Sequence, residues 1–127
     1  MNTITYFKIK KISPQFSVAN IERSIEFYTK KLGFKVDFRF EDFYAGIIKD
    51  DYSIHFKASN PATFERETKK NNDGLNVLLL VEGIEDLCKD LSNKSIPFIQ
   101  PLRSMPYGKE FHIEDPDGNI IAFVEEA

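Results

Sequence analysis

The sequence predicts an α+β fold made of two βαβββ modules that join into one curved, partly open, eight-stranded mixed sheet. Strand-like runs with alternating apolar residues surround two stretches in which apolar residues recur at helical spacing. The order of these runs then repeats, because SVANIERS (17–24) matches LVEGIEDL (80–87) and DDYSIHF (50–56) matches DGNIIAF (117–123). Each repeat is too long for a solenoid unit, and there are only two copies. The repeat therefore favours a pair of modules.

The length of the chain predicts a single domain over residues 1–127. Its two modules are expected at about 12–58 and 75–125. The segment between them, 59–74, is polar and contains Asn-Pro and Asp-Gly pairs, which predicts a linker. The run 4–10 alternates imperfectly, and we expect it to form an extra strand or an arm.

Composition excludes several classes of protein. Hydrophobic residues make up 42% of the chain and charged residues 29%, as in ordinary globular proteins. A net charge of −3 argues against a nucleic-acid partner. No apolar run approaches the ~18 residues that suggest a membrane span, and the first residues lack the pattern of a signal peptide. The single cysteine rules out an internal disulfide, and we predict a cytoplasmic protein.

The first module is predicted to begin with a strand at 12–18, which carries a proline and so lies near an edge or an irregularity. A helix follows with Asn20 as its N-cap and Gly33 at its C-terminus. The apolar positions of this helix are Ile21, Ile25, Tyr28 and Leu32. Three strands are expected next, at 34–40, 43–49 and 52–58, with a turn at Asp50-Asp51.

The second module is predicted to contain a strand at 75–82, a helix, a strand at 96–101 and a final hairpin at 109–124. Residues at helical spacing mark the helix, namely Ile84, Leu87, Cys88 and Leu91. The favoured interpretation of Cys88 is a buried small hydrophobic residue. Pro116 and Gly118 suit the turn of the hairpin.

Alternation assigns the side chains of the final hairpin to two faces. One face carries Phe111, Ile113, Ile121 and Phe123, and the other carries Glu110, His112, Glu114, Ile120, Ala122 and Val124. Both faces of the last strand are apolar. We therefore expect helices to cover one face and a cavity to border the other.

The stretches FSVANIERSIEFYTKKLGF and KEFHIEDPDGNIIAF, in this arrangement, resemble the glyoxalase / bleomycin resistance / dioxygenase superfamily, which has the vicinal oxygen chelate fold. The resemblance covers about residues 12–125. Two stretches, EDFYAGIIKDDYSIHFKAS and MPYGKEFHIEDPDGN, are most similar to the bleomycin resistance proteins. The resemblance implies a homodimer with ligand clefts at its interface, and the run 4–10 is a candidate for a strand exchanged between subunits.

Enzymes of this superfamily hold a divalent metal with the first and last strands of each module. The resemblance carries these positions over to Ser13, His55, Asn76 and Ala122. Only His55 is a good ligand, and moving the first position to Gln15 adds one weak donor. A first-row metal requires three or four imidazole, carboxylate or thiolate donors. The sequence therefore predicts no metal, no cofactor and no catalytic residue, and it leans against an enzyme.

Aromatic residues near the predicted cavity point instead to ligand binding. By resemblance to the bleomycin resistance proteins, Tyr107 lies where a ring stacks on the planar part of the drug. Phe38 and Phe43 align with aromatic positions of the same drug cleft, and Tyr44 lies next to them. For any single ring of this group, packing in the core is the alternative.

Polar residues complete the predicted ligand site. His55 alternates with apolar neighbours, so it should point into the cavity as a hydrogen-bonded lining residue. Asp37, Glu41 and Asp42 flank the aromatic rings and would favour a cationic guest through cation–π and ion-pair contacts. Glu110 is a further candidate, as a ligand contact or as an acid or base in an enzyme. Exposed strand residues are the alternative for these acids.

Three functions follow from the sequence. The first is a metal-free binding protein that sequesters an aromatic small molecule, which the acids would allow to be cationic. Bleomycin-type drugs are the family precedent for such a ligand. The second is a metal-dependent lyase, isomerase or dioxygenase with unusual ligands around His55. The third is a structural or signalling module whose cavity is packed shut by its own phenylalanines. A divalent metal that binds stoichiometrically and is lost in His55→Ala would favour the second.

Overall fold

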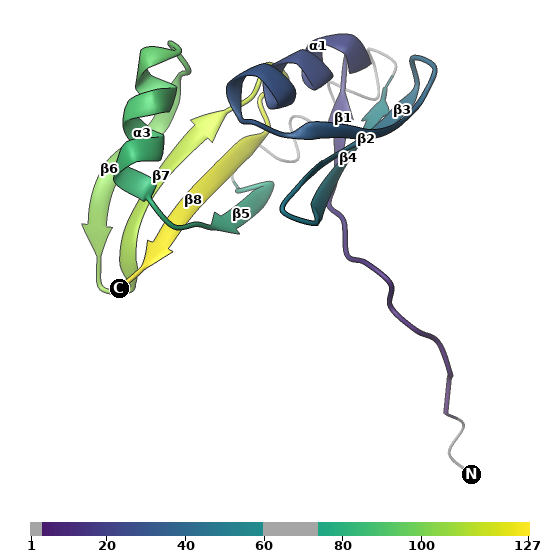
Figure 1. The fold of residues 1–127 in the computed structure, drawn as a ribbon, viewed down its shortest axis with the longest axis horizontal. Helices are drawn as coiled ribbons and strands as arrows, with labels where there is room; N and C mark the ends of the chain where they lie inside the picture. The colour runs from purple at the N-terminus through teal and green to yellow at the C-terminus, as the bar shows by residue number, and fades with distance from the viewer. Residues whose placement is uncertain (1–3, 60–73) are drawn as a thin grey trace.

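The computed structural model describes residues 4–59 and 74–127 and confirms two βαβββ modules of the vicinal oxygen chelate type. Most of the predicted linker lies outside the described residues. Hydrogen bonds divide the eight strands into two open sheets of four strands each. The two modules lie beside each other (Figure 1). No helix within the described ranges is long and apolar enough to cross a membrane.

The first module has the strand order β1-β4-β3-β2, with β1 parallel to β4 and the other pairs antiparallel. Its elements are β1 (Gln15–Val18), α1 (Ile21–Glu26), the π-helical segment η1 (Phe27–Lys31), β2 (Lys35–Phe40), β3 (Tyr44–Lys49) and β4 (Tyr52–Ala58). The first strand is shorter than predicted and begins after Pro14, which has no N–H to donate to a ladder. Asp50 and Asp51 form the predicted turn, with φ of 51° and 70°.

The second module repeats this topology with the strand order β5-β8-β7-β6. Its elements are β5 (Val77–Leu80), α3 (Ile84–Asn93), β6 (Phe98–Met105), β7 (Gly108–Glu114) and β8 (Ile120–Glu126). Strand β6 continues to Met105, beyond the predicted end of this strand at residue 101. Pro101 is tolerated there because β6 is an edge strand whose register shifts between Gln100 and Arg103.

An aromatic core joins α1 and η1 to one face of the first sheet. Asn20 caps the helix as predicted, because its side-chain oxygen accepts a hydrogen bond from the Arg23 N–H at 2.9 Å. Tyr28 is fully buried, and its ring centroid lies 5.0 Å from that of Phe56. Phe16 packs against both of these rings. Since Phe56 faces this core, its neighbour His55 points to the opposite face of the sheet.

Three stacked rings form the core of the second module. The Phe111 ring lies 5.1 Å from Phe98 and 4.9 Å from Phe123, between centroids. Phe111 and Phe123 belong to the core cluster that also includes buried residues of α3, and the partly buried Phe98 packs against this cluster. The predicted faces of the final hairpin are therefore confirmed. Cys88 differs from its expectation, since it packs against this core but remains partly exposed.

The β7–β8 turn ties the second module to α1 and η1. Asp115 and Asp117 in this turn are both buried. The Tyr28 hydroxyl donates to Asp115 at 2.7 Å, and the Arg23 guanidinium donates to Asp117 at 2.6 Å. The Ser24 hydroxyl also donates to Asp117 at 3.2 Å. The predicted Asp-Pro-Asp-Gly-Asn turn is thus both a hairpin turn and a contact between modules.

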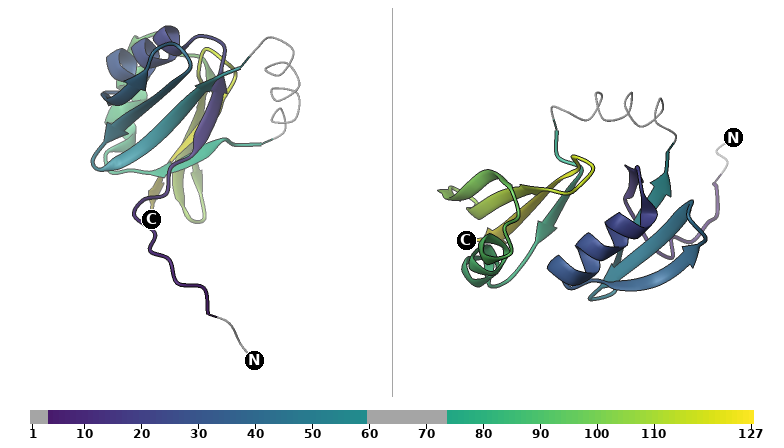
Figure 2. Two further views of the ribbon diagram at one scale, coloured as in Figure 1. Left: turned by 90° about the vertical axis from the view of Figure 1, so that its right-hand side faces the viewer. Right: turned by 90° about the horizontal axis from the view of Figure 1, so that it is seen from above.

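Residues 4–14 form no regular secondary structure, and toward the N-terminus the segment extends away from both sheets (Figures 1 and 2). Near β1 it contacts the first sheet, since Lys11 pairs with Asp37 and the Pro14 carbonyl accepts from the His55 N–H. The segment does not form a strand within its own chain. It exposes large apolar side chains to solvent, namely Ile4, Tyr6, Phe7, Ile9 and Ile12. We call residues 4–12 the N-terminal arm.

Candidate ligand-binding site

One row of paired residues crosses all four strands of the first sheet. His55 in β4 pairs with Gln15 in β1 and with Gly46 in β3, and Gly46 pairs with Phe38 in β2. Residues in one row project to the same face, so these side chains share the face opposite α1. We call this side of the first sheet its open face.

The missing side chain of Gly46 makes room for the Phe38 ring. A Cβ atom at position 46 would overlap that ring. The Phe38 ring therefore covers the glycine, stacks on Tyr44 with centroids 5.9 Å apart, and meets His55 edge-on at 5.0 Å. Sequence reasoning did not single out Gly46. A glycine within a strand is the signal that marks such a close approach.

Hydrogen bonds connect three polar groups along this row. The Gln15 amide donates to the Tyr44 hydroxyl at 3.0 Å. The Tyr44 hydroxyl in turn lies 2.9 Å from Nδ1 of His55. Both the tyrosine and the histidine are thereby held in place on the open face.

Two further phenylalanines extend the ring surface to the β2–β3 turn. Phe40 lies 5.6 Å from Phe38 between ring centroids, and Phe43 stacks on Phe40 at 6.4 Å. Phe40 and Phe43 are 57% and 59% exposed. These phenylalanines are therefore not packed in the core. We call Phe38, Phe40, Phe43, Tyr44 and His55 the aromatic face.

Two of the acidic residues near the aromatic face, Asp37 and Asp42, have basic partners. Asp37 lies at an irregularity of β2 and forms an ion pair with Lys11 at 3.7 Å. Asp42 pairs with Arg39 at 2.7 Å. Burial lowers the pKa of His55 below its ordinary value, Lys11 lowers it further, and Asp37 acts in the opposite direction. His55 is thus favoured in its neutral form.

We expect His55 to titrate below an unperturbed histidine when its ring resonances are followed by NMR against pH. Because Lys11 disfavours the charged imidazole, Lys11→Ala should raise the midpoint. Because Asp37 favours the charged imidazole, Asp37→Asn should lower the titration midpoint of His55. Two unchanged midpoints would mean that the ring does not lie between these charges.

A buried carboxylate organises the open face of the second sheet. Glu110 accepts two hydrogen bonds from the Arg103 guanidinium, at 2.6 and 3.0 Å, and one from the Tyr107 hydroxyl. Nε2 of His112 lies 3.3 Å from the same carboxylate. The bonds from Tyr107 and Arg103 lower the pKa of the Glu110 carboxyl, whereas burial acts against them. Sequence reasoning missed Arg103, because the irregular register of β6 decides where it lies.

The seven predicted ligand residues therefore fall into two groups. Phe38, Phe43, Tyr44, His55 and Asp37 lie on or beside the first sheet, and Tyr107 and Glu110 lie on the second. Within the described ranges, the hydrogen bonds, ion pairs and ring contacts of these seven residues stay within their own module. One chain thus presents an aromatic surface and a separate charged cluster.

The metal positions implied by the family do not fit a metal. In the strand ladders, His55 pairs with Gln15 and Ala122 pairs with Leu78. The first-strand positions opposite them are therefore Gln15 and Leu78, each two residues after Ser13 and Asn76, which alignment indicated. This set supplies one imidazole and one amide, which is too few donors for a first-row metal. In the part of the chain that the structure describes, no three or more His, Cys, Asp or Glu side chains form a potential metal site.

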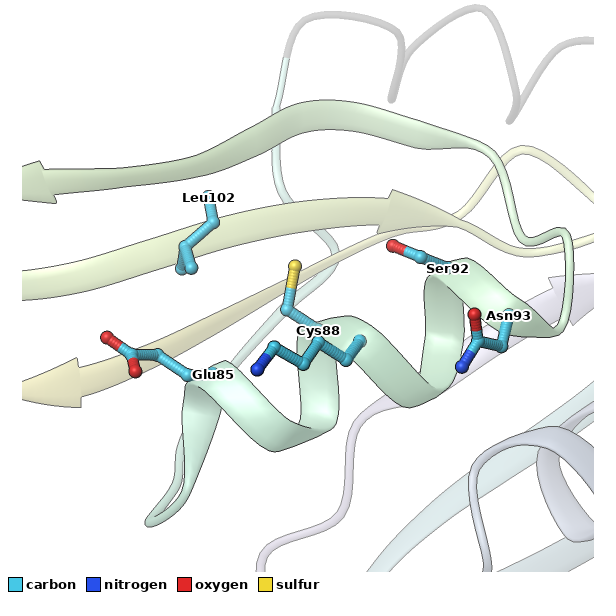
Figure 3. Close-up of a pocket in the computed structure, with 6 residues that line it drawn as sticks. Glu85, Cys88, Ser92, Asn93 and Leu102 are labelled. Carbon is cyan, nitrogen blue, oxygen red and sulfur yellow. The ribbon is translucent and has the colours of Figure 1, made fainter.

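A hollow of about 470 Å³ lies between α3 and β6, away from the aromatic face (Figure 3). Its lining includes no aromatic ring, and the residues are Glu85, Cys88, Lys89, Ser92, Asn93 and Leu102. None of its lining residues belongs to the aromatic face.

The family model of the glyoxalase/bleomycin resistance protein/dioxygenase superfamily matches residues 8–123. The chain belongs to this superfamily. Among curated proteins, none matches the sequence. The match spans both βαβββ modules of the chain.

Solved structures share the fold at low sequence identity. A bleomycin-binding protein from Streptomyces verticillus, complexed with copper(II)-bleomycin, is 18% identical with a TM-score of 0.73, covering 96% of this chain and 100% of its own. TnmS3, an antibiotic-binding protein from a Streptomyces species, is 18% identical with a TM-score of 0.68, covering 95% and 100%. A glyoxalase-related enzyme from Clostridium phytofermentans is 18% identical with a TM-score of 0.75, covering 95% and 98%. At these identities the likeness establishes the fold alone.

Proposed function

We propose that this protein binds and sequesters an aromatic small molecule on the aromatic face, without a metal. The observation that carries the proposal is the stack of Phe38 and Tyr44 over Gly46, beside an edge-on His55. Rings held in place by hydrogen bonds and packing lose little freedom when a flat guest stacks on them. Two proteins of the same fold are named for binding bleomycin or another antibiotic.

The aromatic character of the guest is better supported than a positive charge. Two of the three acids that favoured a cation have basic partners, since Asp37 pairs with Lys11 and Asp42 pairs with Arg39. A cation would have to compete with these partners. The exposure of Phe40 and Phe43 also disfavours a module whose cavity is packed shut.

We further propose a cytoplasmic homodimer in which the open faces of two subunits border each ligand cleft. The edge strand β5 exposes Leu78 and Leu80, which are 50% and 61% accessible. An unpaired edge and exposed apolar side chains favour burial against a second copy. The apolar N-terminal arm is a candidate for exchange. Light scattering of the purified protein tests the dimer, and a monomer at micromolar concentration would contradict it.

The binding proposal is tested by calorimetric titration of chelator-treated protein with metal-free bleomycin and, separately, with anthracene-2-sulfonate. We expect saturable binding of at least one compound and a loss of affinity in Phe38→Ala. Absence of binding to both compounds would contradict the proposal.

A parallel titration with Ni²⁺, Mn²⁺, Fe²⁺ and Zn²⁺ tests metal independence. Because the family positions offer one imidazole and one amide, we expect no tight stoichiometric binding of any of these ions. Stoichiometric binding that is lost in His55→Ala would favour the metal-dependent enzyme instead.

Tyr107 lies on the second sheet and would reach the guest only across the proposed dimer cleft. There Tyr107→Ala should weaken binding of the same aromatic probe about two- to tenfold, the range that one aromatic contact contributes. It should change the free energy of unfolding by less than about 1 kcal/mol, because Tyr107 is 50% exposed. Tyr107→Phe keeps the ring and should retain most of the affinity. A large loss of stability with unchanged affinity would contradict a stacking role for Tyr107.

A further inference from the structure

The hydrogen bonds on the open face favour one tautomer of His55. The Gln15 amide nitrogen donates to the Tyr44 oxygen at 3.0 Å. The tyrosine has one hydroxyl proton, and Nδ1 of His55, at 2.9 Å, is the acceptor beside it. When that proton is donated to Nδ1, the neutral ring carries its own proton on Nε2.

The surroundings of His55 keep this ring neutral. Burial and Lys11 lower the pKa of His55, and Asp37 opposes them. The hydrogen-bonding and ring partners of His55 among the described residues, Tyr44 and Phe38, are uncharged. The Nε2–H group is thus a fixed donor.

This donor is available on the aromatic face. Within residues 4–59 and 74–127, the only hydrogen bond of the His55 ring is the one at Nδ1. In the same ranges, no buried side-chain nitrogen or oxygen lacks a partner, so Nε2 is accessible rather than enclosed. A flat guest stacked beside Phe38 and Tyr44 would place its rim next to this N–H, because both rings contact the imidazole.

We propose that His55 donates a hydrogen bond from Nε2 to a carbonyl oxygen at the rim of a planar aromatic guest, so that the preferred ligands are quinones and related aryl ketones. This inference rests on the proposed aromatic binding function and specifies its ligand class. An aromatic hydrocarbon stacks on the same rings but leaves the Nε2–H group unpaired when it is covered, which costs affinity. Gln15 and Tyr44 are positioning residues, since they act through His55.

The test compares two probes that differ in their carbonyl groups. Anthraquinone-2-sulfonate and anthracene-2-sulfonate share the three-ring outline and the charged group. Their dissociation constants are measured by calorimetry for wild type, His55→Phe, Tyr44→Phe and Tyr52→Phe. Tyr52 is the matched control, because it pairs with Lys49 and lies an odd number of residues from His55, on the opposite side of the sheet.

We expect the preference for the quinone over the hydrocarbon to fall about three- to tenfold in His55→Phe, the range of one hydrogen bond. It should fall by a smaller factor in Tyr44→Phe and stay unchanged in Tyr52→Phe. An unchanged preference in His55→Phe, with the hydrocarbon still bound, would overturn the carbonyl assignment and leave the binding function intact. Failure of both probes to bind wild type would overturn the carbonyl assignment, and it would overturn the binding function as well if metal-free bleomycin also fails to bind.

A second measurement needs no ligand. Nitrogen-15 NMR of the histidine rings at neutral pH should show the proton of His55 on Nε2 and an unprotonated Nδ1. Tyr44→Phe should shift the Nδ1 resonance, because that nitrogen loses its donor, whereas Tyr52→Phe should not. A proton on Nδ1 in wild type would overturn the inference even if the variants fail to fold.

Discussion

Replacing Phe123 by alanine should lower the free energy of unfolding by about 3–5 kcal/mol. The side chain is 4% exposed and stacks on Phe111, which in turn stacks on Phe98. Alanine would leave a cavity at one end of this stack, and the neighbouring strand β7 cannot close it without breaking its own ladder. Urea unfolding followed by circular dichroism measures the change.

Phe43→Ala is the matched control for this substitution, because Phe43 lies largely exposed at the β2–β3 turn. It should cost less than about 1 kcal/mol. A near-neutral effect of Phe123→Ala would mean that β8 presents its other face to α3. That result would contradict the assignment of the two faces of the final hairpin.

Replacing Asp115 by alanine should cost about 3 kcal/mol or more, since several buried donors would lose their acceptor at once. Its carboxylate accepts from the backbone N–H groups of Asp117 and Asn119, both at 2.9 Å, and from the Asn119 side chain at 3.0 Å. It also accepts from the Tyr28 hydroxyl of the other module at 2.7 Å. The variant should therefore weaken both the turn and the contact between modules.

Urea unfolding measures this effect, with Asp86→Ala as the control because Asp86 is exposed on α3. The control should change stability by less than about 1 kcal/mol. Tyr28→Phe removes one of the four donors and should cost less than Asp115→Ala. Equal stability of Asp115→Ala and wild type would contradict the role of this turn as the link between modules.

Local pattern was enough to predict most of the fold. The alternation around Phe111 and Phe123 assigned the faces of β7 and β8 correctly, and the Asn20 cap placed the start of α1. These features depend on residues close together in the chain. The internal repeat then predicted that both modules share one topology, as they do.

The candidate site was less predictable, because its contacts depend on register between strands. The sequence indicated Phe38, Tyr44 and His55 separately, but their contact over Gly46 requires the pairing of β2, β3 and β4. The hydrogen bond from Gln15 depends on the parallel pairing of β1 with β4. No local pattern specifies such pairings.

The charged cluster of the second sheet shows the same limit. Glu110 was selected as a candidate contact without its partner, since Arg103 faces it only after a register shift in β6. The partnered carboxylate changes the expected chemistry of the site. A free acid would attract a cation, whereas a carboxylate bonded to arginine and tyrosine does not depend on the guest for neutralisation.

The most direct test of the aromatic face is an NMR titration of isotope-labelled protein with anthracene-2-sulfonate, in which backbone amide shifts are followed residue by residue. Binding on the aromatic face predicts saturable shifts that are largest at Phe38, Tyr44, Gly46 and His55. Shifts confined to the hollow around Cys88, or no saturable shifts at all, would contradict the proposed site.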